Sequence, residues 1–250
     1  MVNIGLVGKY VELQDAYKSI NESLFHAATY AGYKVKIHYI HSEKLKPENV
    51  GTQLGDLDGI IIAPGFGQRG IDGKFVALKW CREHDIPTLG ICLGMQCMVI
   101  EYARDVLGLE DANSTEMDST TRHNVIDLME EQKSITNMGG TMRLGAYDCH
   151  LRPDSLAAKA YGATEISERH RHRFEFNNSY REALEAAGMQ CVGTNPATGL
   201  VEVVEVPALR WFVGTQYHPE YSSTVLSPSP LFRDFIRAAI EFKHENENKH

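Results

Sequence analysis

The chain has 250 residues, of which 43% are hydrophobic and 23% charged, and its formal net charge is −8. Length and composition fit one globular domain and exclude a disordered or fibrous chain. The negative charge argues against a nucleic-acid partner, because phosphate binding relies on clustered Lys and Arg. No window approaches the roughly 20 apolar residues of a membrane helix, and the start lacks a leader, so we expect no membrane partner and a cytoplasmic location.

The cysteines support a reducing compartment. They are odd in number and form no C-x-x-C pair, which argues against a disulfide framework and a structural zinc site. The five are Cys81, Cys92, Cys97, Cys149 and Cys191.

The first half alternates short β-branched runs with longer helical patterns. Strands are expected at 2–8, 33–40, 59–63 and 86–91, and helices at 14–31, 74–84 and 93–107. This alternation predicts an α/β fold with a mostly parallel central sheet and helices on both faces. In such sheets ligands bind beyond the carboxyl ends of the strands.

The second half is less regular. Strands are expected at 141–151, 172–176, 189–195, 199–206 and 210–218, with several of them antiparallel, and a closing amphipathic helix at 231–242. The polar stretch 110–122 predicts a long, functional loop. We expect one domain over 1–243 and a frayed polar tail over 244–250.

The segment "GICLGMQCM", from Gly90 to Met98, places Cys92 where a buried strand turns into a helix. The positive end of a helix favours a thiolate, and Gly90 and Gly94 remove side chains that would crowd the sulfur. This pattern predicts a nucleophilic cysteine. The alternative is a buried packing cysteine, which is common for free Cys.

A partner for the cysteine is suggested by "TQYHPEY". His218 ends an expected strand and Glu220 follows two residues later, so that both side chains point the same way in extended chain. Pro219 disfavours helix at His218. The carboxylate would orient the imidazole while the imidazole takes the thiol proton. The alternative is a solvated surface pair.

The segment "GFGQRG" (65–70) matches the G-x-G-x-x-G pattern of dinucleotide sites. The expected next strand ends in Cys92, where that fold requires an acidic residue, and no Walker loop is present. We therefore expect no nucleotide phosphate here. The N–H groups of Gly65 and Leu93 are better suited to an oxyanion hole.

In "ERHRHRFEFN", strand alternation would put Arg169, Arg171 and Arg173 on one face and His170 and His172 on the other. The simplest interpretation is a solvated edge strand. The His-x-His pair lacks a third ligand nearby in sequence, so we predict no metal site, whereas one arginine could bind a small carboxylate.

Together, G-x-C-x-G, the P-G of the oxyanion loop and H-P-E resemble the class I (triad) glutamine amidotransferases. More narrowly, seven ordered motifs resemble the glutaminase domains of the CTP synthase family. They are "GKYVELQDAYKSI", "GFGQRGIDGK", "GICLGMQ", "DANSTE", "MGGTMRLG", "ERHRHRFEFNN" and "QYHPEY".

The resemblance implies attack of Cys92 on the side-chain amide of L-glutamine, giving a γ-glutamyl thioester and ammonia. It implies His218 as general base and acid, with Glu220 orienting it, and Gly65 and Leu93 as oxyanion donors. The implied substrate-lining residues are Gly65, Leu93, Gly94, Met95, Gln96, Glu116, which would meet the α-amino group, and Arg173.

Two departures from the family pattern stand out. Pro64 replaces a glycine of the usual P-G-G-F-G loop and offers no N–H. The oxyanion hole survives if the donor is Gly65, whereas Pro64 hinders any flip of this loop during turnover. The amidoligase part, which the resemblance implies as the ammonia acceptor and the site of ATP, UTP, GTP and Mg²⁺, is not among these 250 residues. We expect no cofactor in this domain and a homo-oligomer for the full-length enzyme. The start at the first strand favours an excised domain over a stand-alone subunit.

Two alternatives share the fold. A γ-glutamyl hydrolase-like enzyme would use the same residues in a pocket open to larger substrates. A catalytically silent regulatory module would keep the fold without the chemistry. The presence of Cys92, His218 and Glu220 together argues against the silent module.

Overall fold

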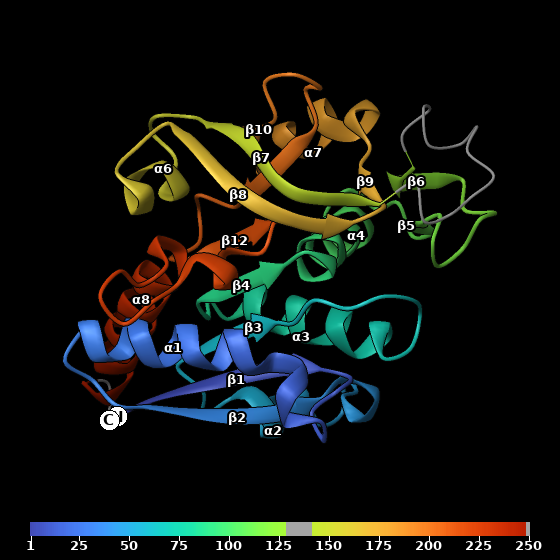
Figure 1. Cartoon of the computed structure of the whole chain (residues 1–250). Helices are drawn as coiled ribbons and strands as arrows, with labels where there is room; N and C mark the ends of the chain where they lie inside the picture. Colours follow the sequence, from blue (N-terminus) through green and yellow to red (C-terminus); the bar gives the residue numbers. More distant parts are fainter. Residues whose placement is uncertain (129–141, 249–250) are drawn as a thin grey trace.

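The computed structural model describes residues 1–128 and 142–248. Its centre is a nine-stranded sheet in the order β2-β1-β3-β4-β12-β11-β10-β7-β8 (Figure 1). Strands of the first half pair parallel with one another and with β12. The five parallel strands are β1 (Val2–Gly8), β2 (Val35–His41), β3 (Gly59–Ile62), β4 (Thr88–Ile91) and β12 (Phe212–Thr215). Strands β3, β4 and β12 are buried throughout, as expected for a parallel sheet covered on both faces.

The other part of the sheet is antiparallel, as the irregular second half predicts. Its strands are β11 (Val201–Glu205), β10 (Gln190–Thr194), β7 (Arg143–Leu151) and β8 (Glu165–His172). Strand β8 forms the edge. It begins earlier than the strand expected at 172–176, which is divided between the end of β8 and β9 (Glu175–Phe176).

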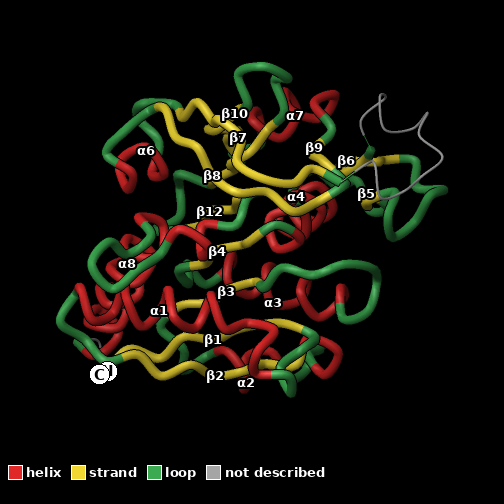
Figure 2. Tube along the Cα trace, in the orientation of Figure 1, coloured by secondary structure: helices red, strands yellow, loops and turns green. Residues whose placement is uncertain are grey.

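Helices cover both faces of the sheet (Figures 1 and 2). On one face α1 (Lys18–Tyr30) and α8 (Pro230–Glu247) bury Leu24 and Phe235 in one hydrophobic core. On the other, α3 (Ile71–Glu83) and α4 (Leu93–Asp105) bury Leu78 and Met98 in a second core. The α/β class is thus confirmed.

Shorter elements complete the described chain. They are helices α2 (Val50–Leu54), α6 (Leu156–Tyr161) and α7 (Arg181–Ala186), and 3-10 helices η1 (Gln14–Tyr17), η2 (Ser42–Lys44), η4 (Asn178–Tyr180) and η5 (Pro219–Ser222). Strands β5 (Ala112–Ser114), β6 (His123–Asp127) and β9 form a second, three-stranded sheet.

Two expected boundaries are wrong. The segment 110–122 contains β5 and is not a continuous loop. Helix α8 continues to Glu247, so most of the expected frayed tail is helical, and 249–250 lie outside the described residues. The first part of "MGGTMRLG" and the expected start of a strand at 141 also lie outside them. Among the described helices, none is long and apolar enough to cross a bilayer.

Candidate active site

Cys92 lies between the end of β4 and the first residue of α4, at the carboxyl edge of the sheet. Its φ of 54° and ψ of −105° place a non-glycine residue in a strained conformation. Such strain costs about 1–3 kcal/mol and persists only where neighbours enforce it. One enforcing contact is the Cys92 N–H, which donates to the Thr215 carbonyl of β12 at 2.7 Å. The sheet therefore holds the sulfur at a sharp strand-to-helix elbow, as predicted.

Gly90 and Gly94, the two glycines beside Cys92, are required for packing and not for access to the sulfur. A Cβ on Gly94 would overlap the carbonyl oxygen of Ile62 in β3, and a Cβ on Gly90 would lie 2.8 Å from the Met98 sulfur. Both glycines therefore allow α4 to pack closely on the sheet. The expectation that they clear a path to the sulfur is replaced by this packing role.

His218 and Glu220 form a buried pair at the end of β12 and the start of η5. The imidazole Nδ1 and the carboxylate Oε1 are 2.7 Å apart, and each residue is about 5% exposed. The backbone N–H of His218 also donates to the carbonyl of Arg169 in β8 at 2.9 Å, while the ring of Tyr221 stacks on the imidazole. Among the described residues, His218 Nε2 has no hydrogen-bond partner, so this nitrogen is available for proton transfer.

Electrostatics favour a charged imidazole. Burial lowers the pKa of His218, but the neighbouring Cys92 and Glu220 outweigh burial and raise this pKa to about 11. His218 is therefore placed to take the thiol proton when Cys92 attacks a substrate. A thiolate formed in this way is the nucleophile of cysteine-dependent acyl transfer.

Two cavities flank the sulfur. The larger has a volume of about 220 Å³ and is lined by Tyr10, Tyr17, Pro64, Cys92 and His218, among others. The smaller has a volume of about 10 Å³, which is room for one water molecule. It is lined by Gly65, Phe66, Cys92, Gln96, Glu116, His172, Arg173 and Phe174.

The smaller cavity brings together four of the predicted substrate residues, from four separate segments: Gly65, Gln96, Glu116 and Arg173. It is closed in this conformation, partly because Glu116 Oε1 accepts the N–H of Gly67 at 3.0 Å. This cavity is therefore too small for an amino acid in this conformation and must widen to bind one.

The predicted oxyanion donors are available. Among the described residues, the N–H groups of Gly65 and Leu93 donate no hydrogen bond. The loop that contains Gly65 is held by two lysines, since Lys74 Nζ donates to the Ala63 carbonyl at 2.6 Å and Lys9 Nζ donates to the Phe66 carbonyl.

Not every predicted residue lines a cavity, and some important ones were missed. Leu93, Gly94 and Met95 line neither cavity at Cys92, and Met95 is fully buried. Lys74 was missed, although a lysine on the apolar face of its helix, three residues after Ile71, is a readable signal. Gln216, whose Nε2 donates to the Cys92 sulfur at 3.7 Å, offers no comparable signal.

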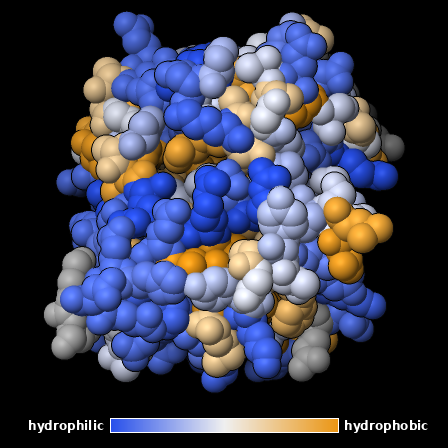
Figure 3. Space-filling view, turned by 90° about the vertical axis from the view of Figure 1, so that its left-hand side faces the viewer, coloured by the Kyte–Doolittle hydropathy of each residue, from blue (hydrophilic) through white to orange (hydrophobic). Residues whose placement is uncertain are grey.

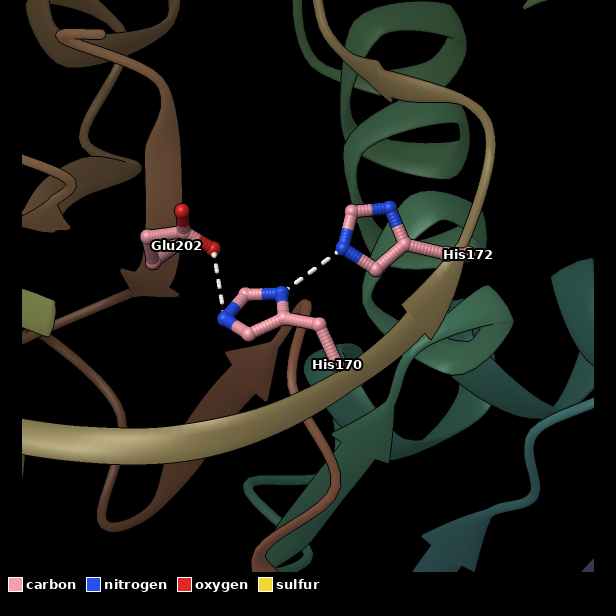
Figure 4. Close-up of side chains that lie close together, drawn as sticks. All are labelled: His170, His172 and Glu202. Atoms are coloured by element: carbon pink, nitrogen blue, oxygen red, sulfur yellow. Dashed lines mark hydrogen bonds and ion pairs between the residues drawn. The ribbon is translucent and has the colours of Figure 1, made fainter. Parts of the chain in front are cut away.

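The structure supplies the third partner that the His-x-His pair lacked in sequence. Among the described residues, His170 and His172 of β8 and Glu202 of β11 form one group of side chains that could hold a metal ion (Figure 4). Their possible ligand atoms all lie within 4.8 Å of one another. The two imidazoles are hydrogen-bonded to each other at 2.7 Å, shorter than the roughly 3.3 Å between two nitrogens on one tetrahedral zinc. Arg143 also binds Glu202 at 3.0 Å. The group is therefore arranged for hydrogen bonding.

A larger groove of about 680 Å³ lies between α1, α6 and α8, and shares no lining residue with the cavities at Cys92. The face shown in Figure 3 is largely hydrophilic, with hydrophobic side chains in several separate patches. None of Cys92, His218 and Glu220 lines this groove.

Comparisons with known proteins agree with this geometry. Residues 12–238 match the family model of the class-I glutamine amidotransferases. A CTP synthase of Bacteroides fragilis is 68% identical over 240 residues, which are 96% of this chain and 45% of that protein. A CTP synthase of Porphyromonas gingivalis is 66% identical over 246 residues, or 98% of this chain and 46% of that protein.

The solved glutaminase domain of the Trypanosoma brucei CTPS, with bound acivicin, is 37% identical and superposes with a TM-score of 0.91. The match covers 96% of this chain and 94% of that one. The chain spans about half the length of the curated relatives named above. It belongs to the class-I glutamine amidotransferase family and, within it, to the glutaminase domains of CTP synthases.

Proposed function

We propose that the chain hydrolyses the side-chain amide of L-glutamine through a γ-glutamyl thioester on Cys92. The observation that carries this proposal is the strained Cys92 elbow, placed beside the buried His218–Glu220 pair and the free N–H groups of Gly65 and Leu93. Nucleophile, base, orienting carboxylate and oxyanion donors then occupy one site.

In this mechanism the thiolate of Cys92 attacks the amide carbon, and the developing oxyanion accepts hydrogen bonds from Gly65 and Leu93. His218 Nε2 gives its proton to the leaving nitrogen, so that ammonia departs and the thioester forms. Water then loses a proton to His218 and attacks the thioester, which releases glutamate and restores the thiolate. Glu220 holds the imidazole in place through both steps.

Two further residues would fix the amino-acid end of glutamine. Glu116 has a carboxylate suited to the α-amino group, and Arg173 has a guanidinium suited to the α-carboxylate. Both line the small cavity with Gln96. The distance between these two groups and the Cys92 sulfur would select the γ-amide.

We further propose that the ammonia serves an amidoligase part that converts UTP to CTP. The names of the relatives, and the half of their length that this chain spans, support the proposal. ATP, UTP, GTP and Mg²⁺ would bind to that part, and the complete enzyme would be a homo-oligomer. The five free, buried cysteines support a reducing, cytoplasmic setting.

The alternative of a γ-glutamyl hydrolase-like enzyme requires a pocket open to larger substrates. The pairing of Glu116 with Arg173 at the small cavity, suited to the two charges of a free amino acid, favours glutamine itself. Hydrolysis rates for free glutamine and for a γ-glutamyl peptide distinguish the two functions. Selective hydrolysis of free glutamine is the expected result.

Release of glutamate from glutamine by the wild-type chain, Cys92→Ala and Cys97→Ala tests the proposal. Cys92→Ala should reduce the rate to background. Cys97 lies in α4, fully buried, and burial raises the pKa of its thiol to about 11, so Cys97→Ala should keep the rate within about threefold. Equal losses in both variants would rule out Cys92 as the nucleophile.

A further inference from the structure

Five side chains from four strands form a closed ring of polar contacts beside the small cavity, which we name the β8 ring. Its side chains are at most 10% exposed. The members are Arg143 of β7, His170 and His172 of β8, Glu175 of β9 and Glu202 of β11. Because β9 belongs to the three-stranded sheet, the ring joins the two sheets.

The contacts follow one another around the ring. Arg143 lies 3.0 Å from both Glu175 Oε1 and Glu202 Oε1. Glu202 Oε2 lies 3.5 Å from His170 Nε2, and His170 Nδ1 is hydrogen-bonded to His172 Nε2 at 2.7 Å (Figure 4). His172 Nδ1 closes the ring at 3.4 Å from Glu175 Oε1.

Counting protons shows that this ring needs one more than its neutral imidazoles supply. Two neutral imidazoles carry two N–H groups, and one of them is used between His170 and His172. The second N–H can donate to Glu202 at one end of the imidazole pair or to Glu175 at the other end, but not to both. A third proton on one carboxyl satisfies the remaining end, and it also balances the charge, because two carboxylates face one guanidinium.

The position of that third proton fixes both tautomers. A proton on Glu202 is donated to His170 Nε2, so both imidazoles carry hydrogen on Nδ1. A proton on Glu175 reverses the chain, so both carry hydrogen on Nε2. Burial raises the pKa of Glu175 to about 8 and that of Glu202 to about 7, which keeps one proton in the ring near neutral pH. These values favour Glu175, but the Phe174 carbonyl 3.2 Å from His172 Nδ1 can only accept a hydrogen bond, and this contact places the proton on Glu202.

The tautomer of His172 affects the small cavity through the carbonyl group of Phe174. The Phe174 carbonyl lies 3.2 Å from His172 Nδ1 and accepts Gln96 Nε2 at 3.0 Å. Gln96 also donates to Gln216 Oε1 at 3.1 Å, and Gln216 Nε2 donates to the Cys92 sulfur at 3.7 Å. Only the Nδ1–H tautomer of His172 gives the Phe174 carbonyl its second donor.

We propose that Glu202, His170 and His172 are positioning residues, in which a proton held at Glu202 sets the tautomer that fixes the Phe174 carbonyl and thereby Gln96 in the glutamine pocket. This proposal rests on the proposed glutaminase function. None of the three need touch the reacting atoms of glutamine.

Two isosteric variants fix the opposite tautomers. In Glu202→Gln the amide NH₂ replaces the carboxyl proton, so His172 keeps Nδ1–H. Glu175 Oε1 already accepts from Arg143, so in Glu175→Gln the amide oxygen stays on Arg143 and the NH₂ takes the place of the unpartnered Oε2. Turned toward His172 Nδ1, this NH₂ donates to it and removes the donor to Phe174. With Cys92→Ala as the parent, calorimetry measures glutamine affinity without turnover. We expect Glu202→Gln to keep Kd within about twofold and Glu175→Gln to weaken it about tenfold, as for one lost buried hydrogen bond.

The control is Glu205→Gln, in the same strand β11. Glu205 is equally buried but accepts the N–H groups of Leu156 and Ala157 at the start of α6, outside the ring. The Glu205→Gln substitution should leave the glutamine affinity unchanged. Equal weakening by Glu202→Gln and Glu175→Gln, or by neither, would overturn the proposal, because a purely structural ring does not distinguish its two carboxyls.

Nitrogen-15 NMR of the imidazoles supplies a readout that needs no ligand. We expect Nδ1–H on His170 and His172 in the wild type and in Glu202→Gln, and Nε2–H on both in Glu175→Gln. Nε2–H tautomers in the wild type with normal glutamine binding would overturn the ring proposal alone. Nδ1–H tautomers in a parent that binds no glutamine would overturn the proposed function and, with it, the positioning role.

Discussion

At Cys92, backbone strain and electrostatics act on the same residue. The positive φ points the side chain out of the sheet edge, and the charged His218 stabilises the thiolate there. Burial raises the thiol pKa of each of the four other cysteines, to about 11 for Cys97 and about 12 for Cys81 and Cys191, and further still for Cys149. Reactivity should therefore be confined to one sulfur.

Substitution of Pro64 tests which residue supplies the oxyanion donor. Proline has no N–H, so Gly65 must provide it if the proposal holds. Pro64→Gly should lower the free energy of unfolding by about 1 kcal/mol, through greater freedom of the unfolded chain, and leave kcat for glutamine within about threefold. Steady-state kinetics together with urea unfolding measure both quantities. A rise in kcat of tenfold or more would show that an N–H at position 64 is the better donor.

At the scale of elements, the approach of α4 to β3 and β4 sets the elbow. A methyl group at position 94 would collide with the backbone oxygen of Ile62, which cannot move without displacing the sheet. Gly94→Ala should therefore cost about 3 kcal/mol or more in the free energy of unfolding, measured by chemical denaturation.

Gly65→Ala is the matched comparison. A Cβ at Gly65 would meet Leu93 and Lys9 at 3.5 Å, an ordinary contact distance, so its free energy of unfolding should change by less than about 1 kcal/mol. A similar loss in both variants would mean that the packing of α4 on the sheet is not what position 94 requires.

Local patterns in the sequence were sufficient to predict some elements and not others. The parallel strands were predicted because their buried runs are continuous and apolar, and His218 and Glu220 because they are neighbours two residues apart. Strand β8 was placed too late because its inward side chains are Glu168, His170 and His172, which hide the apolar alternation that predicts a strand. The pairing of His170 with Glu202, 32 positions away, depends on the order of strands in the sheet.

For the whole molecule, buried carboxyl groups should make stability depend on pH. Glu168 of β8 is hydrogen-bonded to Tyr161 at 2.8 Å, and burial raises its pKa from 4.5 to about 7. Because the folded pKa lies above the unfolded one, its contribution is complete below pH 4.5 and is lost as the pH rises through 7. The free energy of unfolding should fall by up to about 3 kcal/mol over this range.

Glu168→Gln should remove this part of the slope between pH 5 and pH 8, measured by urea unfolding at each pH. Glu165→Gln, at the exposed start of the same strand, should leave the slope unchanged. An unaltered slope in Glu168→Gln would show that its carboxyl group titrates normally in the folded protein.

The central claim is that Cys92 is the nucleophile of a glutamine site. Labelling with a glutamine analogue that carries an electrophile at the γ position, followed by peptide mapping with mass spectrometry, tests it most directly. We predict a single adduct, on Cys92, that excess glutamine suppresses. Adducts spread over several cysteines, or an adduct on Cys92 that glutamine does not suppress, would contradict the claim.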